Sequence, residues 1–372
     1  MALFDENVTI VPQRRQRPRA TVVGIWAVTV ALFALLALTL LPTPFVIQQP
    51  GPVYDTLGTA SDRNGGQTPL ITVAGAQTYP TEGELDLLTV QVVGNREHTP
   101  SWFELATAWF DPSRAVIPVE EIYPEGVTTE QRDEQSAAMM VDSQQEATAA
   151  ALLELGYDVP SVVTVVEVLD GSAAQGVLLP EDIIVAAEGT VIDQTSRLRD
   201  IINAGDGAPV ALTVLRGVDT LEVEVTPREG TVDGQSVWLI GISTRQDYDF
   251  PVDVTLRIDD VGGPSAGMMF ALGIIDTLTE EQLTGGEIIA GTGTIDAAGT
   301  VGPIGGIRQK LYGADGAGAD YFLAPESNCA EVVGHVPDGV RVFAVATLDD
   351  ALDALAAVRD GADLDALPTC SS

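Results

Sequence analysis

Lysine is almost absent from this chain of 372 residues, because among its 18 basic residues Lys310 alone is a lysine. An ATP-binding P-loop needs Gly-Lys-Ser/Thr, and here the only lysine follows Gln309, so we expect no ATP binding. Histidine is also scarce. His98 and His335 lie in no recognisable motif, so a Ser-His-Asp triad is not expected.

Cysteine is limited to Cys329 and Cys370. The two form no Cys-x-x-Cys pair and no Cys/His cluster, so we expect neither a zinc site nor any other metal or cofactor. A location outside the cytoplasm would permit a disulfide between them. Two separate surface thiols are the alternative, and the sequence leaves both open.

Positive charge is scarce overall, with 18 basic against 54 acidic residues and a net charge of −36. The first 19 residues carry +2, which leaves −38 on the rest of the chain. A surface this anionic repels nucleic acid and anionic lipid. We therefore expect no nucleic-acid partner.

Residues 20–41 form a stretch of 22 residues without a charge. As a helix this stretch is about 33 Å long, enough to cross a bilayer. The arginines that precede it place residues 1–19 in the cytoplasm and the rest of the chain outside. A cleaved signal peptide would have a shorter apolar region followed by a small-x-small site. We therefore expect a retained single-pass transmembrane helix over 20–41 and an extracytoplasmic main part.

The next residues read as a linker followed by regular elements. Residues 42–83 are rich in Pro, Gly, Thr and Gln, with a turn expected over 49–52. A strand is expected over 85–93 and a helix over 130–155.

Residues 158–229 alternate short strands with one amphipathic helix over 196–204. The order of these elements resembles a bacterial PDZ domain, with Gly171-Ser172-Ala173-Ala174 and Asp182-Ile183-Ile184 as matching motifs. The resemblance implies capture of an extended peptide as an added strand. A packing module without a ligand is the alternative. Glu181 stands where the family usually has glycine, which leaves the shape of that turn open.

The run Gly262-Gly263-Pro264-Ser265-Ala266-Gly267 connects a strand-like segment to a helical one. Pro264 suits the first position of a helix, which would put Ser265 in the first turn. Unpaired N–H groups and the positive end of the helix dipole lie there, a place that stabilises an oxyanion. Gly263 and Gly267 would leave room for a substrate backbone. Alone this is a weak signal, because many Gly-Pro-Ser turns only cap helices.

Lys310 is the expected partner of Ser265, as its general base. Arginine cannot lose its proton within a protein, whereas lysine can, and a general base for serine must do so. Ile307, Lys310, Leu311 and Ala314 share one face of a helix, while Arg308 and Gln309 point elsewhere. Burial on that face would lower the lysine pKa, and the nearby helix N-terminus would add to the effect.

These residues resemble the proteolytic domain of Lon proteases. The matching segments are Gly262 to Gly267, Thr292-Gly293, Val301 to Leu311 and Tyr321 to Pro325. The resemblance implies a Ser265–Lys310 dyad, with Thr292 beside it and Gly263, Pro264, Ala266 and Gly267 as supporting residues. Two departures concern tuning and regulation: Gly262 replaces an acidic residue of Lon, and Thr294 replaces a glutamate.

The whole layout resembles bacterial membrane-anchored PDZ–Lon-like peptidases. Met140 to Ala147 resembles the helix before the catalytic strands, which implies a PDZ domain inserted into the peptidase domain. The expected fold class is α+β, with a transmembrane helix, a β-rich PDZ domain and a Lon-type α/β domain. The expected parts are a cytoplasmic N-terminus (1–19), a transmembrane helix (20–41), a juxtamembrane linker (42–83), the first part of the Lon-like domain (84–157), the PDZ domain (158–229), the catalytic domain (230–358) and a C-terminal tail (359–372).

The resulting expectation is an ATP-independent serine endopeptidase acting on unfolded or exposed polypeptides. Two alternatives stay open: a non-enzymatic membrane-tethered PDZ scaffold with a degenerate peptidase fold, and a precursor that processes only itself. Lon relatives form rings, so a homo-oligomer is also open.

Overall fold

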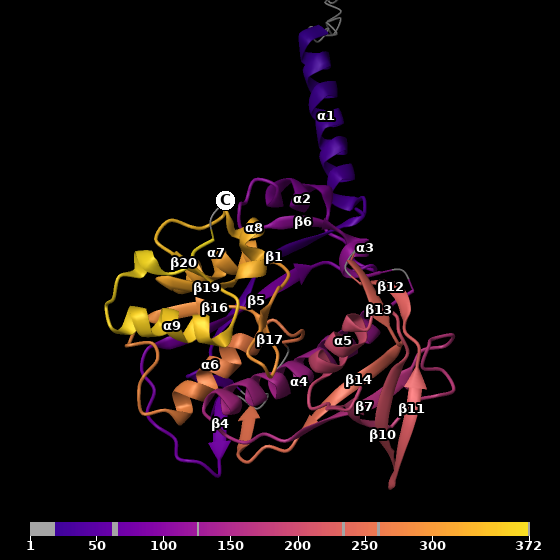
Figure 1. Cartoon of the computed structure of the whole chain (residues 1–372). Coiled ribbons are helices and arrows are strands. Elements are labelled where there is room, and N and C mark those ends of the chain that lie inside the picture. Colours follow the sequence, from indigo (N-terminus) through magenta and orange to yellow (C-terminus); the bar gives the residue numbers. More distant parts are fainter. Residues whose placement is uncertain (1–18, 62–65, 125, 233–234, 259–260, 371–372) are drawn as a thin grey trace, which may run out of the picture. The chain divides into compact units, whose positions relative to one another are not determined.

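A computed structural model describes residues 19–61, 66–124, 126–232, 235–258 and 261–370. By its internal contacts the chain divides into a smaller unit of residues 1–49 and 92–127 and a larger unit of residues 50–91 and 128–372. Both contain helices and strands (Figure 1), as expected for a mixed α+β protein.

The smaller unit is built around short elements. Its β1 pairs antiparallel with β6, from Phe45 opposite Pro118 to Gln48 opposite Ala115. A capping box in which Ser101 and Glu104 bond each other's backbone begins α2. The elements are α1 (Arg19–Leu40), the start of β1 (Phe45–Asp55), α2 (Trp102–Ala108), β6 (Ala115–Pro118) and α3 (Val119–Ile122).

The transmembrane helix predicted over 20–41 coincides in range with α1. Within the described residues, however, no helix combines the length and the apolarity needed to cross a membrane, so the transmembrane assignment is not supported.

A sheet of mainly parallel strands forms the core of the larger unit, in the order β20–β19–β16–β5–β1. The strand β16 pairs in parallel with β5 on one side and β19 on the other. These strands are apolar along most of their length because helices cover them. The elements are β5 (Glu84–Val93), β16 (Ile288–Gly291), β19 (Tyr321–Pro325), β20 (Arg341–Val345), α4 (Thr129–Glu154), α6 (Gly267–Leu278), α7 (Ile307–Ala317) and α9 (Leu348–Arg359).

The segment 42–83, expected as a linker, contains strands instead. Besides β1 these are β2 (Thr59–Ser61), β3 (Gln67–Pro69) and β4 (Ile71–Ala74), which pairs with β15 (Asp253–Leu256). The expected turn over 49–52 lies inside β1. Pro50 and Pro52 are tolerated in β1 because β6 pairs only with residues Phe45 to Gln48. Among the described residues no strand pairs with this edge of β1 beyond them, so it needs no backbone N–H as a donor there.

The PDZ-like part has its own sheet, in the order β11–β10–β8–β7–β14, and its own apolar core. It extends past the expected end at residue 229, because β14 closes the sheet beside β7. Glu181 has φ +70°, so it adopts the left-handed conformation usual for the glycine that it replaces. The elements are β7 (Ser161–Val168), β8 (Ile183–Ala187), β9 (Thr190–Val191), α5 (Thr195–Ala204), β10 (Val210–Arg216), β11 (Asp219–Val225), β12 (Arg228–Val232), β13 (Gln235–Leu239) and β14 (Ile242–Tyr248).

In sequence the PDZ-like part lies between α4 and β15. In space α4 packs against α6, and β5 pairs with β16 in the mainly parallel sheet. Elements from before and after the PDZ-like part therefore build one core.

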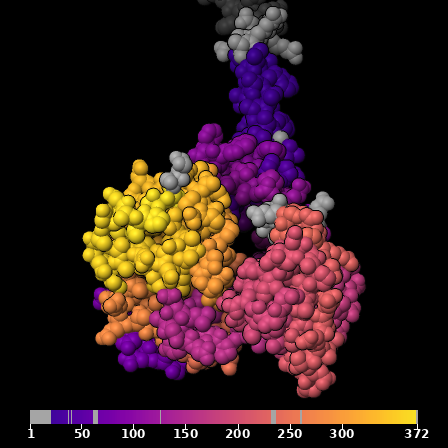
Figure 2. All heavy atoms as spheres, viewed as in Figure 1, coloured from indigo at the N-terminus to yellow at the C-terminus, as the bar shows by residue number. Residues whose placement is uncertain are grey.

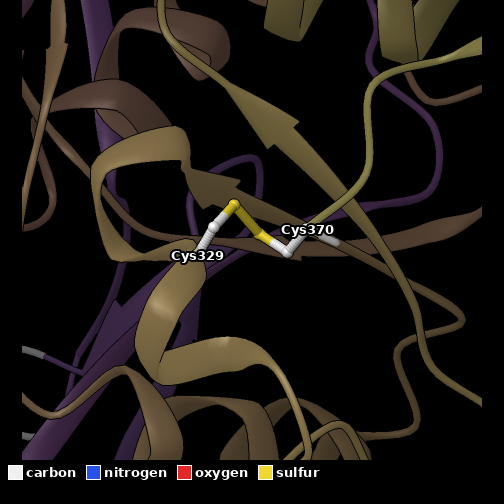
Figure 3. Close-up of a disulfide and its surroundings, with 2 residues drawn as sticks. All are labelled: Cys329 and Cys370. Carbon is white, nitrogen blue, oxygen red and sulfur yellow. A yellow bond between two sulfur atoms is a disulfide. The ribbon is translucent and has the colours of Figure 1, made fainter. Parts of the chain in front are cut away.

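The C-terminal segment is fastened to the larger unit. A disulfide joins Cys329, the first residue of α8 (Cys329–Val332), to Cys370 (Figure 3). The N–H of Ala344 donates a 2.9 Å hydrogen bond to the carbonyl of Pro368. In Figure 2 this segment and α9, in yellow, lie on the surface of that unit. The remaining elements are β17 (Thr294–Ile295), β18 (Val301–Gly302), η1 (Glu326–Asn328) and η2 (Leu364–Ala366).

Candidate active site

Ser265 lies in the turn just before α6, not within the helix. The sequence placed Pro264 at the first helical position, but α6 begins at Gly267 and Ala266 is its N-cap. The carbonyl of Pro264 accepts a 3.3 Å bond from the Gly267 N–H, which closes the turn. Within the described residues, the N–H groups of Ser265 and Ala266 have no hydrogen-bond partner.

The backbone conformation and the close approach of neighbouring side chains explain the glycines around Ser265. Gly263 has φ +87°, which other residues rarely adopt. A side chain on Gly267 would meet Ser143 Oγ at 2.9 Å, and one on Gly262 would meet Ser136 Cβ at 2.8 Å. The close approach of α4 thus accounts for glycine at position 262, where Lon has an acidic residue.

Lys310 lies in the first turn of α7, and its side chain is 1% exposed. Its Nζ donates to Ser265 Oγ at 2.8 Å. The structure therefore brings together the two residues that the sequence predicted as a dyad, in direct hydrogen-bond contact.

Thr292 connects the two residues further. It follows β16 and is also 1% exposed. Its hydroxyl accepts from Lys310 Nζ at 2.8 Å and donates to the carbonyl of Ser265 at 2.9 Å. The N–H of Gly293 donates to the same carbonyl at 3.0 Å. The end of β16 thus holds the Ser265 backbone and the Lys310 amine at once.

Burial changes the chemistry of the amine. Because the protein interior disfavours the charged ammonium, it lowers the Lys310 pKa from its usual 10.5 to about 7. A large fraction of the amine is then neutral near pH 7, and a neutral amine can accept a proton from a serine hydroxyl.

The predicted buried face of α7 is correct, but the helix is buried more widely than predicted. Ile307, Leu311 and Ala314 are fully buried. Gln309, expected to point elsewhere, is 2% exposed. The reason is that α7 is enclosed by more than one neighbour, whereas periodicity alone predicts a single covered face.

Two side chains near the site were not singled out from the sequence. Ser143, in α4, donates to the Pro264 carbonyl at 3.0 Å and so supports the serine turn. Asn328 accepts from the N–H of Ile304 and donates to its carbonyl, both at 2.9 Å. The only sequence signal for Asn328 was its place three residues after the Lon-like segment Tyr321 to Pro325.

The histidines contribute nothing to this site. His98 is exposed, and its backbone N–H donates to the side chain of Asn95. The ring of His335 contacts the carbonyl of Glu331. No cluster of residues in the described ranges could hold a metal ion.

Comparison with known proteins finds a family model that is similar to the part of the chain containing this site. Residues 258–357, which contain Ser265, Thr292 and Lys310, match the Lon protease (S16) C-terminal proteolytic domain. This part of the chain is similar to a Lon-type proteolytic domain. The matched range ends in α9, and the disulfide residue Cys370 lies beyond it.

Several Lon proteases are similar to part of the chain. That of Campylobacter concisus is 30% identical over 187 residues, which are 49% of this chain and 23% of the relative. Lon protease 2 of Herpetosiphon aurantiacus is 37% identical over 109 residues, 27% of this chain and 13% of the relative. The chain thus spans less than a quarter of the length of these relatives.

Solved structures similar to the chain include the PDZ domains of SdrC-like proteins from Listeria monocytogenes and Listeria innocua. Each is 23% identical with a TM-score of 0.20 and covers 22% of this chain; the shares of the two Listeria chains covered are 85% and 92%.

Proposed function

We propose that this chain is a serine endopeptidase in which Ser265 is the nucleophile and Lys310 the general base. The observation that carries the proposal is the 2.8 Å contact between Lys310 Nζ and Ser265 Oγ, made by an amine that burial holds near its neutral form. A nucleophile and its base within hydrogen-bond reach are the usual arrangement of covalent catalysis.

In this mechanism the neutral amine of Lys310 takes the hydroxyl proton as Ser265 Oγ bonds the peptide carbonyl carbon. The intermediate collapses, the C–N bond breaks, and the leaving amine receives the proton from Lys310. Water then attacks the acyl-enzyme and gives a proton to Lys310, which returns it to Ser265 Oγ as the ester bond breaks.

The oxyanion of each intermediate needs hydrogen-bond donors that are already in place. The unpartnered N–H groups of Ser265 and Ala266 fit this role. They lie beside the nucleophile in a turn held by Ser143, Thr292 and Gly293, so little reorganisation is needed when charge develops.

The PDZ-like part would capture the substrate. Within the described residues β14 pairs with β7 alone, so its other edge can add a peptide strand. A polar cavity of about 270 Å³ lies at this place, lined by residues of β14 and α5 together with Glu146 and Asp296. A peptide held along β14 would reach the cavity next to the catalytic part.

Without a P-loop, unfolding of the substrate by ATP hydrolysis is not expected, so we propose unfolded or exposed polypeptides as substrates. The single-pass anchor over 20–41 and the extracytoplasmic location stay predictions from the sequence. Fractionation of cells that express the full chain, followed by protease protection, tests both.

Incubating the full chain with casein tests the peptidase. We expect cleavage by the wild type and none above background by Ser265→Ala or Lys310→Arg, because arginine keeps its proton. Equal turnover in either variant would remove the dyad. Cleavage of the chain itself without cleavage of casein would favour the self-processing precursor. No cleavage at all, with binding of unfolded peptides retained, would favour the scaffold.

A further inference from the structure

Asn328 forms a paired contact with the segment that leads into the helix of Lys310. It ends η1, is 2% exposed, and has both ends of its side-chain amide engaged. Its Oδ1 accepts from the Ile304 N–H and its Nδ2 donates to the Ile304 carbonyl, both at 2.9 Å. The amide thus takes up the donor and the acceptor of one residue, as a neighbouring strand would.

This contact lies in the connection from β18 to α7. Gly302 ends β18 and α7 begins at Ile307, so Ile304 is in the middle of a short irregular segment. No side chain of the described residues caps α7, and its N-cap Gly306 has φ +71°. The Asn328 amide therefore supplies a fixed point just before the helix starts.

Lys310 depends directly on where α7 starts. Its N–H donates to the Gly306 carbonyl at 3.1 Å, so it belongs to the first turn after the fixed segment. A shift or fraying of that turn would move Nζ away from Ser265 Oγ. Misplacement by about 1 Å can lower a rate roughly 100-fold.

Asn328 is itself held in place. Its neighbour Cys329 is covalently bonded to Cys370 (Figure 3), and its Nδ2 also donates to Glu331 Oε1 at 3.1 Å. A buried amide with its partners satisfied is costly to displace, because breaking the pair would strand polar groups away from water.

We propose that Asn328 is a positioning residue that fixes the start of α7 and so aims Lys310 Nζ at Ser265 Oγ. This inference rests on the proposed function. Asn328 contacts neither reacting atom and acts through Ile304 and the first turn of α7.

The single lysine allows a direct test that does not depend on activity. In the full chain grown with ¹³Cε-lysine, Lys310 gives the only lysine signal, and its titration can be followed by NMR. We expect a midpoint near 7 in the wild type. In Asn328→Leu, similar in size and uncharged, a loosened first turn would admit water and raise the midpoint by about one unit or more.

The matched control is Glu331→Ala, which removes the third bond of Asn328 but leaves both bonds to Ile304. It should keep the wild-type midpoint. In casein cleavage we expect Asn328→Leu to lower kcat about 10- to 100-fold with KM within about twofold, because alignment and not binding is lost.

An unchanged midpoint or an unchanged kcat in folded Asn328→Leu would overturn the proposal. If that variant does not fold, Asn328→Ser is measured in its place, and failure of both to fold would show a general structural role and also overturn it. Ser265→Ala is run in the same assay. If the wild type shows no Ser265-dependent cleavage, the proposed function fails, whereas the NMR midpoint still decides whether Asn328 positions Lys310.

Discussion

The hydroxyl of Thr292 donates a 2.9 Å hydrogen bond to the backbone carbonyl of Ser265. The same hydroxyl accepts from Lys310 at 2.8 Å. One buried oxygen therefore orients the amine and fixes the main chain of the nucleophile, so its loss should affect catalysis more than substrate binding.

Replacing Thr292 tests this arrangement. Thr292→Val keeps the shape but loses both bonds, and we expect kcat to fall about 10- to 100-fold with little change in KM. Thr292→Ser keeps the hydroxyl and should stay within about threefold of the wild type. Steady-state cleavage of a fluorogenic peptide measures both, and equal rates for Val and Ser would contradict the role.

The pH dependence follows from the buried amine. Because Lys310 acts as a base only when neutral, kcat/KM should rise with pH through a midpoint near 7 and level off above it. Below the midpoint the rate should fall about tenfold per pH unit. A midpoint near the usual lysine pKa of 10.5 would show that the amine is not held neutral.

Burial of Lys310 should also cost stability. Its folded pKa is lowered, so at pH 6 both the folded and the unfolded chain hold the proton and the cost is fully present. Between about 7 and 10.5 the unfolded state holds more protons, and stability rises with pH. We expect the free energy of unfolding of Lys310→Met to be roughly 1–3 kcal/mol higher than that of the wild type at pH 6. Urea unfolding should show this difference shrinking by pH 9.

Asp86 should show the opposite trend. It is 2% exposed in β5, and burial, followed by the charges of Glu84 and Asp55, raises its pKa to about 7. Its raised pKa means that the folded state holds the proton between about 3.8 and 7, so stability falls as pH rises through that range. Asp86→Asn should be about 1–3 kcal/mol more stable than the wild type at pH 8 and about equal at pH 4, by urea unfolding. No gain at pH 8 would mean that the carboxylate is solvated.

The disulfide should stabilise the larger unit. Cys329 and Cys370 are 41 residues apart. A cross-link over such a loop lowers the entropy of the unfolded chain, which raises the free energy of unfolding by roughly 3–4 kcal/mol. We expect Cys329→Ala/Cys370→Ala to melt several degrees below the oxidised wild type. Reductant should lower the Tm of the wild type and leave the double variant unchanged.

Local patterns in the sequence were sufficient to predict that Ser265 and Lys310 lie together. Ser265 stood in a short motif, and Lys310 stood out as the one lysine on an apolar helix face. The helix α5 also matches its predicted range of 196–204 within one residue, since it is amphipathic over its own length.

What the sequence could not reveal depends on distant neighbours. Pro264 fits a helix start, but the helix begins at Gly267, because Pro264 closes the turn before it. The strand β4, within 42–83, pairs with β15 far along the chain, and composition carries no record of such a partner. The link between Asn328 and the site depends on its contact with Ile304, which is 24 residues away in sequence and leaves no local pattern.

The position of the PDZ-like part between α4 and β15 has a consequence for folding during synthesis on the ribosome. Glu84 of β5 pairs with Ile288 of β16, so this pair cannot form until about three quarters of the chain has been synthesised. The PDZ-like sheet pairs mostly with itself and can form during that delay. Ser265 and Lys310, the proposed dyad, then meet only late, which would keep a nascent peptidase from cutting its own unfolded segments.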